Sequence, residues 1–207
     1  MNKGKLIVIS GPAGIGKGTV CKEIIKQDDS LALSISWTTR DIRKNEIADV
    51  TYFYHSEEEF AQMVEQGGFL EYAGIYGNHY GTPRDYVEKM MAEGKNVILE
   101  IETQGAMKVM QNVQDVVSIY LLPPTMRVLR DRLFNRGRED VKKANKRFRA
   151  AFDEIKLAKE YQYVIINDDL NKTCEKVLDI IHDRPYENPE DIEGIINKLR
   201  QAVEEEA

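Results

Sequence analysis

The chain has 207 residues, of which 42% are apolar and 31% are charged. These values fit one domain with insertions or two small domains, and they exclude a large multidomain assembly and a globally disordered chain. No stretch approaches the roughly 20 continuous apolar residues of a membrane-spanning helix, and the first apolar run is too short for a signal peptide. We therefore expect no membrane partner.

The formal net charge of −6 argues against a nucleic-acid partner, but the charge is unevenly distributed. Residues 127–149 carry ten basic and three acidic side chains. Two explanations are open: a solvated helix face with paired charges, or a surface that binds an anion. The two cysteines, Cys21 and Cys174, lack the spacing of a zinc site or a disulfide framework, so the expected compartment is the cytoplasm.

Short, almost wholly apolar runs typical of strands recur along the chain. In order they are Lys5–Ser10, Leu31–Ser36, Val97–Ile101, Val116–Leu122 and Tyr163–Ile166. Helical patterns separate most of them, beginning with a helix near Lys17. Apolar strands that alternate with helices predict a parallel sheet covered on both faces, a three-layer α/β fold whose ligands gather at the carboxyl ends of the strands.

Two segments depart from this alternation. The interval from Thr38 to Met91 is rich in Tyr, Gly and charge and has only one clear helix, which the capping-box spacing from Ser56 predicts, so we interpret it as an inserted subdomain. After Leu170 a helix is expected to about His182. A last helix with Asn188 as cap and Pro189 at its first position follows. Its apolar stripe predicts docking on the core or a dimer contact, and the choice between monomer and homo-oligomer is left open.

A glycine-rich segment follows the first predicted strand and opens the first helix. Its residues are Gly11, Pro12, Ala13, Gly14, Ile15, Gly16, Lys17, Gly18 and Thr19. In this context the pattern predicts a P-loop, whose backbone N–H groups and helix N-terminus bind phosphates while Lys17 contacts the β and γ phosphates of a nucleoside triphosphate. The structural alternative is a plain strand-to-helix turn, which would not need a lysine at that place.

One position of this loop departs from the usual P-loop pattern. A Ser or Thr normally follows the lysine and binds Mg²⁺, whereas Gly18 stands here and Thr19 comes one residue later. The Gly-Lys-Gly-Thr form resembles adenylate kinases, in which the metal is held largely by phosphates and water. This departure argues against direct Mg²⁺ ligation by the loop, and Thr19 is the one candidate metal ligand that we retain there.

The insertion supplies side chains suited to a second phosphate. Arg40 and Arg43 lie close together in the sequence, and Tyr52 and Tyr80 follow. Guanidinium groups bind phosphate oxygens in bidentate fashion, and tyrosine hydroxyls add neutral donors, so the set suits a monophosphate. Surface salt bridges are the alternative for either arginine.

At this point the sequence resembles the guanylate kinase family, from Leu6 to about His182. The shared blocks are Gly-Pro-Ala-Gly-Ile-Gly-Lys from Gly11, Ser-Trp-Thr-Thr-Arg-Asp-Ile-Arg from Ser36, Gly-Gly-Phe-Leu-Glu-Tyr-Ala ending at Ala73, Tyr-Gly-Thr at 80–82, Glu-Ile-Glu-Thr-Gln-Gly at 100–105, and Ile-Asn-Asp-Asp-Leu ending at Leu170. The resemblance implies a P-loop kinase core over 1–37 and 92–207, a GMP-binding subdomain over 38–91, a helical lid over 126–149, and a C-terminal extension helix over 184–207.

The resemblance also implies roles for individual residues on the GMP side. Ser36, Arg40, Arg43, Tyr52 and Tyr80 match the ligands of the acceptor phosphate. Glu71 matches the carboxylate that accepts hydrogen bonds from guanine N1 and its exocyclic amine, Thr82 the hydroxyl that donates to O6, and Glu102 stands where the family usually has Asp near that amine.

The loop after Arg43 departs from the family pattern. The family's usual Pro, two Gly and Asp are replaced by Ile42, Asn45, Asp49 and Thr51. Because the flanking phosphate ligands survive, we expect an altered affinity before an altered specificity.

On the ATP side, Arg132, Arg136 and Arg147 match family arginines that close over the two nucleotides. Arg132 and Arg136 are i,i+4 neighbours on one predicted helix, and Arg147 lies on the next. These positions favour anion binding as the explanation for the basic run. Asn167 matches the family's adenine-side loop, although a plain strand-terminating turn is the alternative.

Together these features predict an enzyme that transfers the γ-phosphoryl group of Mg²⁺-ATP to GMP, as part of purine nucleotide metabolism. Three rivals are kept: a kinase for another monophosphate or a sugar phosphate, a non-catalytic scaffold module that binds phosphopeptides, and RNA binding by the basic lid. The scaffold modules typically lose the phosphate loop, whereas Lys17 and the arginines are present here.

Overall fold

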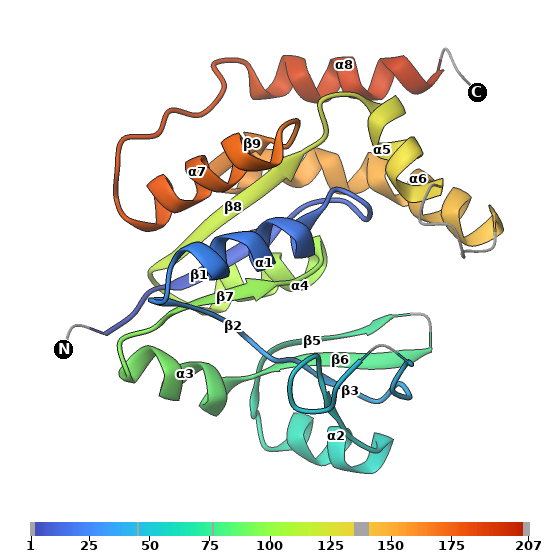
Figure 1. The fold of residues 1–207 in the computed structure, drawn as a ribbon. Helices are drawn as coiled ribbons and strands as arrows, with labels where there is room; N and C mark the ends of the chain where they lie inside the picture. Colours follow the sequence, from blue (N-terminus) through green and yellow to red (C-terminus); the bar gives the residue numbers. More distant parts are fainter. Residues whose placement is uncertain (1–2, 45, 76, 135–140, 205–207) are drawn as a thin grey trace.

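The computed structural model describes residues 3–44, 46–75, 77–134 and 141–204. A five-stranded parallel sheet in the order β2-β7-β1-β8-β9 forms its centre (Figure 1). The strands are β1 (Leu6–Ser10), β2 (Leu31–Leu33), β7 (Asn96–Glu100), β8 (Val116–Leu122) and β9 (Tyr163–Ile166). All five residues of β1 are buried, as expected for a central strand covered on both faces. The predicted parallel sheet is confirmed.

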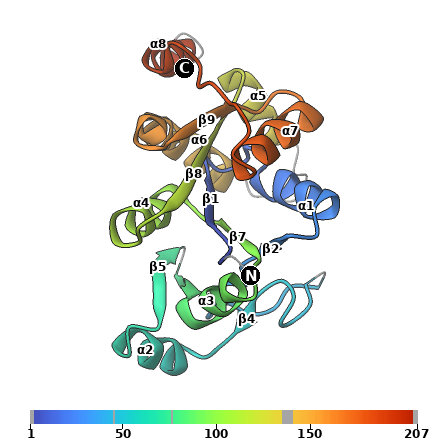
Figure 2. The same cartoon turned by 90° about the vertical axis from the view of Figure 1, so that its left-hand side faces the viewer.

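Helices cover both faces of this sheet. Figure 2 shows α1 (Lys17–Gln27) and α7 (Leu170–Ile181) on one side, and α4 (Thr103–Asn112) and α6 (Val141–Ile155) on the other. The short helix α5 (Met126–Phe134) precedes α6, and a 3₁₀ turn, η1 (Lys156–Glu160), leads into β9. The predicted three-layer arrangement is therefore confirmed.

The insertion contains a second sheet that the sequence pattern did not predict. Its strand order is β4-β3-β6-β5, with β3 (Trp37–Thr38), β4 (Phe53–Tyr54), β5 (Phe69–Ile75) and β6 (Asn78–Pro83). Long antiparallel pairing joins β5 to β6, whereas β3 and β4 contain two residues each. Strands of two residues are too short to show an alternation in sequence, and β6 contains Asn, Gly and Pro, which are rare in strands. The expectation of only one clear helix in this segment is also wrong, because a second helix covers Arg84–Ala92.

The predicted helix of the insertion is confirmed as α2 (Glu57–Glu65). The Ser56 hydroxyl accepts a hydrogen bond from the Glu59 amide at 3.1 Å, and the Glu59 carboxylate accepts one from the Ser56 amide at 2.9 Å. This reciprocal capping box stabilises the helix by about 1 kcal/mol. The insertion ends in α3 (Arg84–Ala92), which packs on β7 of the central sheet.

Two predicted boundaries are wrong. Strand β2 ends at Leu33 instead of Ser36, because the chain leaves the central sheet there and enters the second sheet at Trp37. The last helix, α8 (Ile192–Glu204), begins after Asn188, whose side-chain oxygen accepts from the Val164 amide at 2.8 Å and so binds β9. The Asp191 carboxylate caps the helix instead, accepting from the Gly194 amide at 2.7 Å.

Helix α8 docks on the core as predicted, because its residues Ile196 and Leu199 are buried against α5 and η1. Both cysteines, Cys21 and Cys174, are buried and unpaired. Among the residues that the structure describes, no helix is long and apolar enough to cross a bilayer.

Candidate active site

The glycine-rich segment forms a loop between β1 and α1. Gly14 and Gly16 adopt φ values of 80° and 103°, which β-carbon-bearing residues rarely adopt. A β-carbon at Gly16 would also lie only 3.1 Å from the Asn167 amide nitrogen. The loop therefore depends on glycine both for its backbone shape and for the close approach of a neighbouring side chain, and it leads directly into a helix N-terminus suited to an anion.

Lys17 is the first residue of α1 and turns back over the loop. Its Nζ donates to the carbonyl oxygens of Gly11 at 2.6 Å and Pro12 at 3.4 Å. Burial lowers the pKa of Lys17, while the nearby carboxylates of Glu100 and Glu154 oppose that shift. The ammonium group is thus held over the loop by backbone carbonyls, where a phosphate would offer it an acceptor of full negative charge.

Two carboxylates border this loop. A β-carbon at Gly18 would stand 3.1 Å from Glu100 Oε1, so the carboxylate at the end of β7 lies against the start of α1. Glu154, near the end of α6, accepts a hydrogen bond from the Ala13 amide at 3.3 Å. Burial raises the pKa of Glu154, and Lys17 opposes that shift. The loop therefore lies between one acidic group from the central sheet and one from helix α6.

Arg132 and Asn167 converge on the same carbonyl of the loop. Arg132 Nη1 donates to the Ile15 oxygen at 3.1 Å, and the buried Asn167 side chain donates to it at 2.8 Å. Both Nη atoms of Arg132 also donate to the Asn167 backbone oxygen at 3.2 Å. These hydrogen bonds connect helix α5 and the end of β9 to the glycine-rich loop.

The second sheet holds a buried carboxylate opposite a buried hydroxyl. Glu71 on β5 is paired in register with Thr82 on β6, and the Thr82 hydroxyl donates to Glu71 Oε1 at 2.7 Å. A β-carbon at Gly105, on α4, would lie 2.7 Å from Glu71 Oε2, so this helix approaches the carboxylate closely. Burial raises the pKa of Glu71, and the Thr82 hydrogen bond and the charge of Lys108 oppose the shift. A buried carboxylate of this kind is stabilised most by a ligand that offers it further N–H donors.

A cluster of arginine and tyrosine side chains lies in the same subdomain. Arg40 Nε donates to the Tyr80 hydroxyl at 3.2 Å, and the guanidinium carbon lies 5.2 Å from the centre of the Tyr52 ring. The other edge of the guanidinium forms a two-bond ion pair with Glu46, at 2.8 Å for each bond. Arg43, three residues further on, is exposed.

Comparisons with known proteins agree on one family. The guanylate kinase family model matches residues 3–184. The chain belongs to the guanylate kinase family. The chain is 48% identical to a guanylate kinase of Caldanaerobacter subterraneus over 179 residues, covering 86% of this chain and 87% of that protein. It is also 43% identical to one from Halalkalibacterium halodurans, covering 99% of this chain and 98% of that protein.

A solved structure agrees with the sequence comparisons. The crystal structure of a guanylate kinase from Anaplasma phagocytophilum is 32% identical to this chain, with a TM-score of 0.71, and the match covers 88% of this chain and 86% of that one. The expected enzyme class, a guanylate kinase with a parallel central sheet, is confirmed.

Within this guanylate kinase the predicted site residues form two groups. Lys17, Arg132 and Asn167 contact the phosphate loop, whereas Arg40, Tyr52, Tyr80, Glu71 and Thr82 lie in the second sheet and the loop beside it. Of the other predicted ligands, Ser36, just before β3, and Arg147, on α6, are partly buried, while Thr19 and Glu102 are exposed. Arg136 lies outside the described residues.

Two of the predicted ligand side chains already form hydrogen bonds within the protein. Asn167 is not a mere turn residue, because its amide nitrogen is bonded to the loop carbonyl of Ile15. The Thr82 hydroxyl already donates to Glu71, so donating to a guanine O6 requires that hydroxyl to rotate. Both groups are structural elements of the site in addition to any contact with a nucleotide.

Sequence reasoning gave no role to three carboxylates that border the site: Glu46, Glu100 and Glu154. A signal existed for two of them. Glu100 is the one charged residue of the apolar run Val97–Ile101 and stands near its carboxyl end, and Glu154 is two helical turns after Arg147 on the same helix. Glu46 had none, because its contacts arise from the shape of a loop.

Proposed function

We propose that this guanylate kinase transfers the γ-phosphoryl group of ATP to GMP, with ATP in the phosphate loop and GMP in the insertion. The observation that carries the proposal is the buried Glu71 carboxylate beside Thr82, in a chain that keeps Lys17 in its phosphate loop. Guanine offers two N–H donors on the edge that a carboxylate would meet, whereas adenine offers one donor and an acceptor. Adenine would therefore leave the buried carboxylate partly unpaired.

The reaction asks the protein for positioning and charge compensation. An oxygen of the GMP phosphate attacks the γ-phosphorus, the bond from that phosphorus to the bridging oxygen breaks, and ADP leaves with the electron pair. The attacking oxygen is already anionic, so no general base is required. Lys17 and the lid arginines, Arg132 among them, would compensate the charge that spreads over the transferring group.

The residues beside the loop fit Mg²⁺ bound with ATP. Gly18 carries no hydroxyl, but its missing β-carbon leaves room for the Glu100 carboxylate, and Thr19 is exposed in the first turn of α1. Carboxylate oxygens and water are the ligands that Mg²⁺ favours. When bound, the ion would supply further charge compensation at the phosphates, with Glu100 as the oxygen group of this chain nearest to Gly18 and Thr19 as the second candidate.

Replacing Glu100 with Gln is expected to weaken Mg²⁺-ADP binding by about 10-fold, because the amide keeps the shape of the side chain and loses its negative charge. Calorimetric titration with ADP, with Mg²⁺ and with EDTA in its place, measures this directly. Without Mg²⁺, ADP should bind Glu100→Gln at least as tightly as wild type, because a carboxylate that repels the phosphates is gone. Glu93→Gln, at an exposed carboxylate at the end of α3, is the matched control. Equal Mg²⁺ dependence in Glu100→Gln and wild type would remove Glu100 from the metal site.

The proposed function is tested by a coupled assay with ATP and each nucleoside monophosphate in turn. GMP is expected to exceed AMP in kcat/KM by at least about 100-fold, since the site is built to hydrogen-bond the guanine edge. A preference for AMP or dGMP over GMP would favour the rival monophosphate kinase instead. A cytoplasmic location of the protein stays a prediction, based on its two unpaired cysteines.

A further inference from the structure

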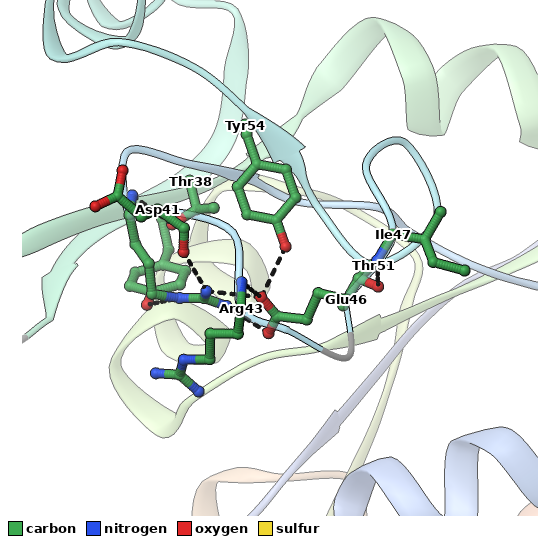
Figure 3. A network of polar contacts seen from close by, with 9 residues as sticks. Thr38, Asp41, Arg43, Glu46, Ile47, Thr51 and Tyr54 are labelled. Carbon is green, nitrogen blue, oxygen red and sulfur yellow. Dashed lines mark hydrogen bonds and ion pairs between the residues drawn. The ribbon is translucent and has the colours of Figure 1, made fainter.

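The Glu46 carboxylate is the centre of the polar network beside the acceptor-phosphate residues. Its Oε1 accepts from Arg40 Nη2, and its Oε2 accepts from Arg40 Nη1, each at 2.8 Å. Figure 3 shows the Tyr54 hydroxyl and the Arg43 backbone directed at the same carboxylate, and each donates to Oε2 at 2.9 Å. The side chains of Arg40 and Glu46 are only 10% and 16% exposed. The pair is therefore shielded from solvent and held by several donors at once.

These contacts leave Arg40 little freedom. A guanidinium has five N–H donors, and the described residues engage four of them: Nε bonds to Tyr80, one N–H of Nη1 bonds to the Asp41 carbonyl at 2.8 Å, and two bond to Glu46. Because the Tyr80 hydroxyl accepts from Arg40, its own hydrogen is directed elsewhere and is available to donate. Fixing the orientation of Arg40 therefore also fixes the direction in which Tyr80 donates.

The Glu46 carboxylate also fixes the backbone of Arg43. The Arg43 amide donates to the Glu46 side chain, and the Glu46 amide donates to the Arg43 carbonyl at 2.9 Å, which closes the turn between them. The segment 40–51 contains neither Gly nor Pro, so no turn-forming residue of those types sets its shape. In Figure 3 the Arg43 guanidinium extends away from Glu46, which leaves it directed out of the network.

We propose that Glu46 is the positioning residue of the acceptor-phosphate pocket, holding Arg40 and Arg43 in the arrangement that receives the phosphate of the nucleoside monophosphate. This inference rests on the proposed function, because it assumes that these arginines bind that phosphate. Hydrogen bonds from Arg40 lower the pKa of Glu46 to about 2, so the carboxylate stays ionised throughout the pH range in which the enzyme is assayed. The alternative is that Glu46 competes with the phosphate for Arg40 and opposes binding.

The decisive variant is Glu46→Gln, which keeps the length of the side chain but replaces one acceptor oxygen with a donor that repels Arg40. If Glu46 positions the pocket, KM for GMP rises roughly 10- to 100-fold, kcat falls much less, and KM for ATP stays unchanged. If Glu46 competes with the phosphate, KM for GMP falls instead. The matched control is Asp41→Asn, which removes one negative charge from the same loop, because Asp41 contacts Arg40 only through its backbone carbonyl.

Two measurements separate positioning from a general loss of structure. Calorimetry with GMP and with guanosine should show weaker GMP binding in Glu46→Gln, while guanosine, which has no phosphate, binds both proteins equally. In an Arg40→Ala background, Glu46→Gln should have a much smaller effect on GMP affinity than in wild type, because its main target is gone. If Glu46→Gln does not fold, Tyr54→Phe is the variant to measure. It removes one donor to the carboxylate, so KM for GMP should rise about 3-fold.

The inference is overturned if KM for GMP is unchanged or lower in Glu46→Gln, if guanosine binding falls as much as GMP binding, or, where Glu46→Gln does not fold, if Tyr54→Phe binds GMP as wild type does. In each of these cases wild type still phosphorylates GMP, so the proposed function stands. If the wild-type chain neither binds nor phosphorylates GMP, the proposed function fails, and the inference fails with it.

Discussion

Replacing Lys17 with alanine is expected to lower kcat by about 10³-fold or more while leaving the affinity for GMP within about 3-fold of wild type. The ammonium group lies at the mouth of the phosphate loop, 2.6 Å from the Gly11 carbonyl, and its removal leaves the loop without a mobile positive charge. The carboxylates of Glu100 and Glu154 would then face the incoming phosphates without the cation that now offsets them. Steady-state kinetics with ATP and GMP, with calorimetry for GMP alone, measures both quantities.

The control for this substitution is Lys22→Ala, which removes an exposed lysine from the same helix. It should retain wild-type kinetics. Turnover of Lys17→Ala within a few-fold of wild type would refute the role of Lys17, and an equal loss of GMP affinity would show that the lysine supports the whole fold of the site instead of the ATP phosphates.

Replacing Glu71 with glutamine is expected to lower kcat/KM for GMP on the order of 10³-fold, with KM for ATP unchanged. Glutamine can still accept a hydrogen bond from Thr82 through its oxygen, but its amide group places a donor against the donors of guanine. Glu71 is buried and Gly105 lies against its carboxylate, so a donor left without a partner there is costly. A panel of GMP, IMP and AMP measures the change in preference.

This substitution also has a pH signature. Because burial raises the pKa of Glu71, the protonated carboxyl accumulates at a higher pH than for an ordinary glutamate, and GMP affinity of wild type should fall as the pH is lowered toward that pKa. Glu71→Gln should lack this component, which separates it from titration of the GMP phosphate itself. The control is Glu65→Gln on α2, an exposed carboxylate of the same subdomain. An unchanged ratio of GMP to AMP in Glu71→Gln would remove the carboxylate from base recognition.

The central sheet and the phosphate loop were predictable from the sequence for a physical reason. Strands buried on both faces must be almost wholly apolar, and a loop with φ values of 80° and 103° at Gly14 and Gly16 requires glycine, so both features leave a local signal. The second sheet left a weaker signal, because β3 and β4 have only two residues each and pair with segments distant in the chain, and β6 contains Asn, Gly and Pro, which are rare in strands.

The start of α8 illustrates the same limit. A local reading of Asn188 and Pro189 gave a helix cap, yet Asn188 binds the amide of Val164 on β9, a partner 24 residues away. A side chain with both donors and acceptors can satisfy either a local or a distant backbone group, and the choice depends on which strand edge is within reach once the chain has folded.

The amino-acid order by itself determined the alternation of strands and helices and the glycine-rich loop with Lys17, because each of these depends on neighbours within a few positions. The residues expected to contact GMP rest on the family resemblance and stay predictions. Only the tertiary structure decided that Arg132 and Asn167 share the Ile15 carbonyl, that Glu100 lies against Gly18, and that Glu46 holds Arg40. Hydrogen bonds and ion pairs form over about 3 Å in space, but their two partners can be any number of residues apart in the sequence.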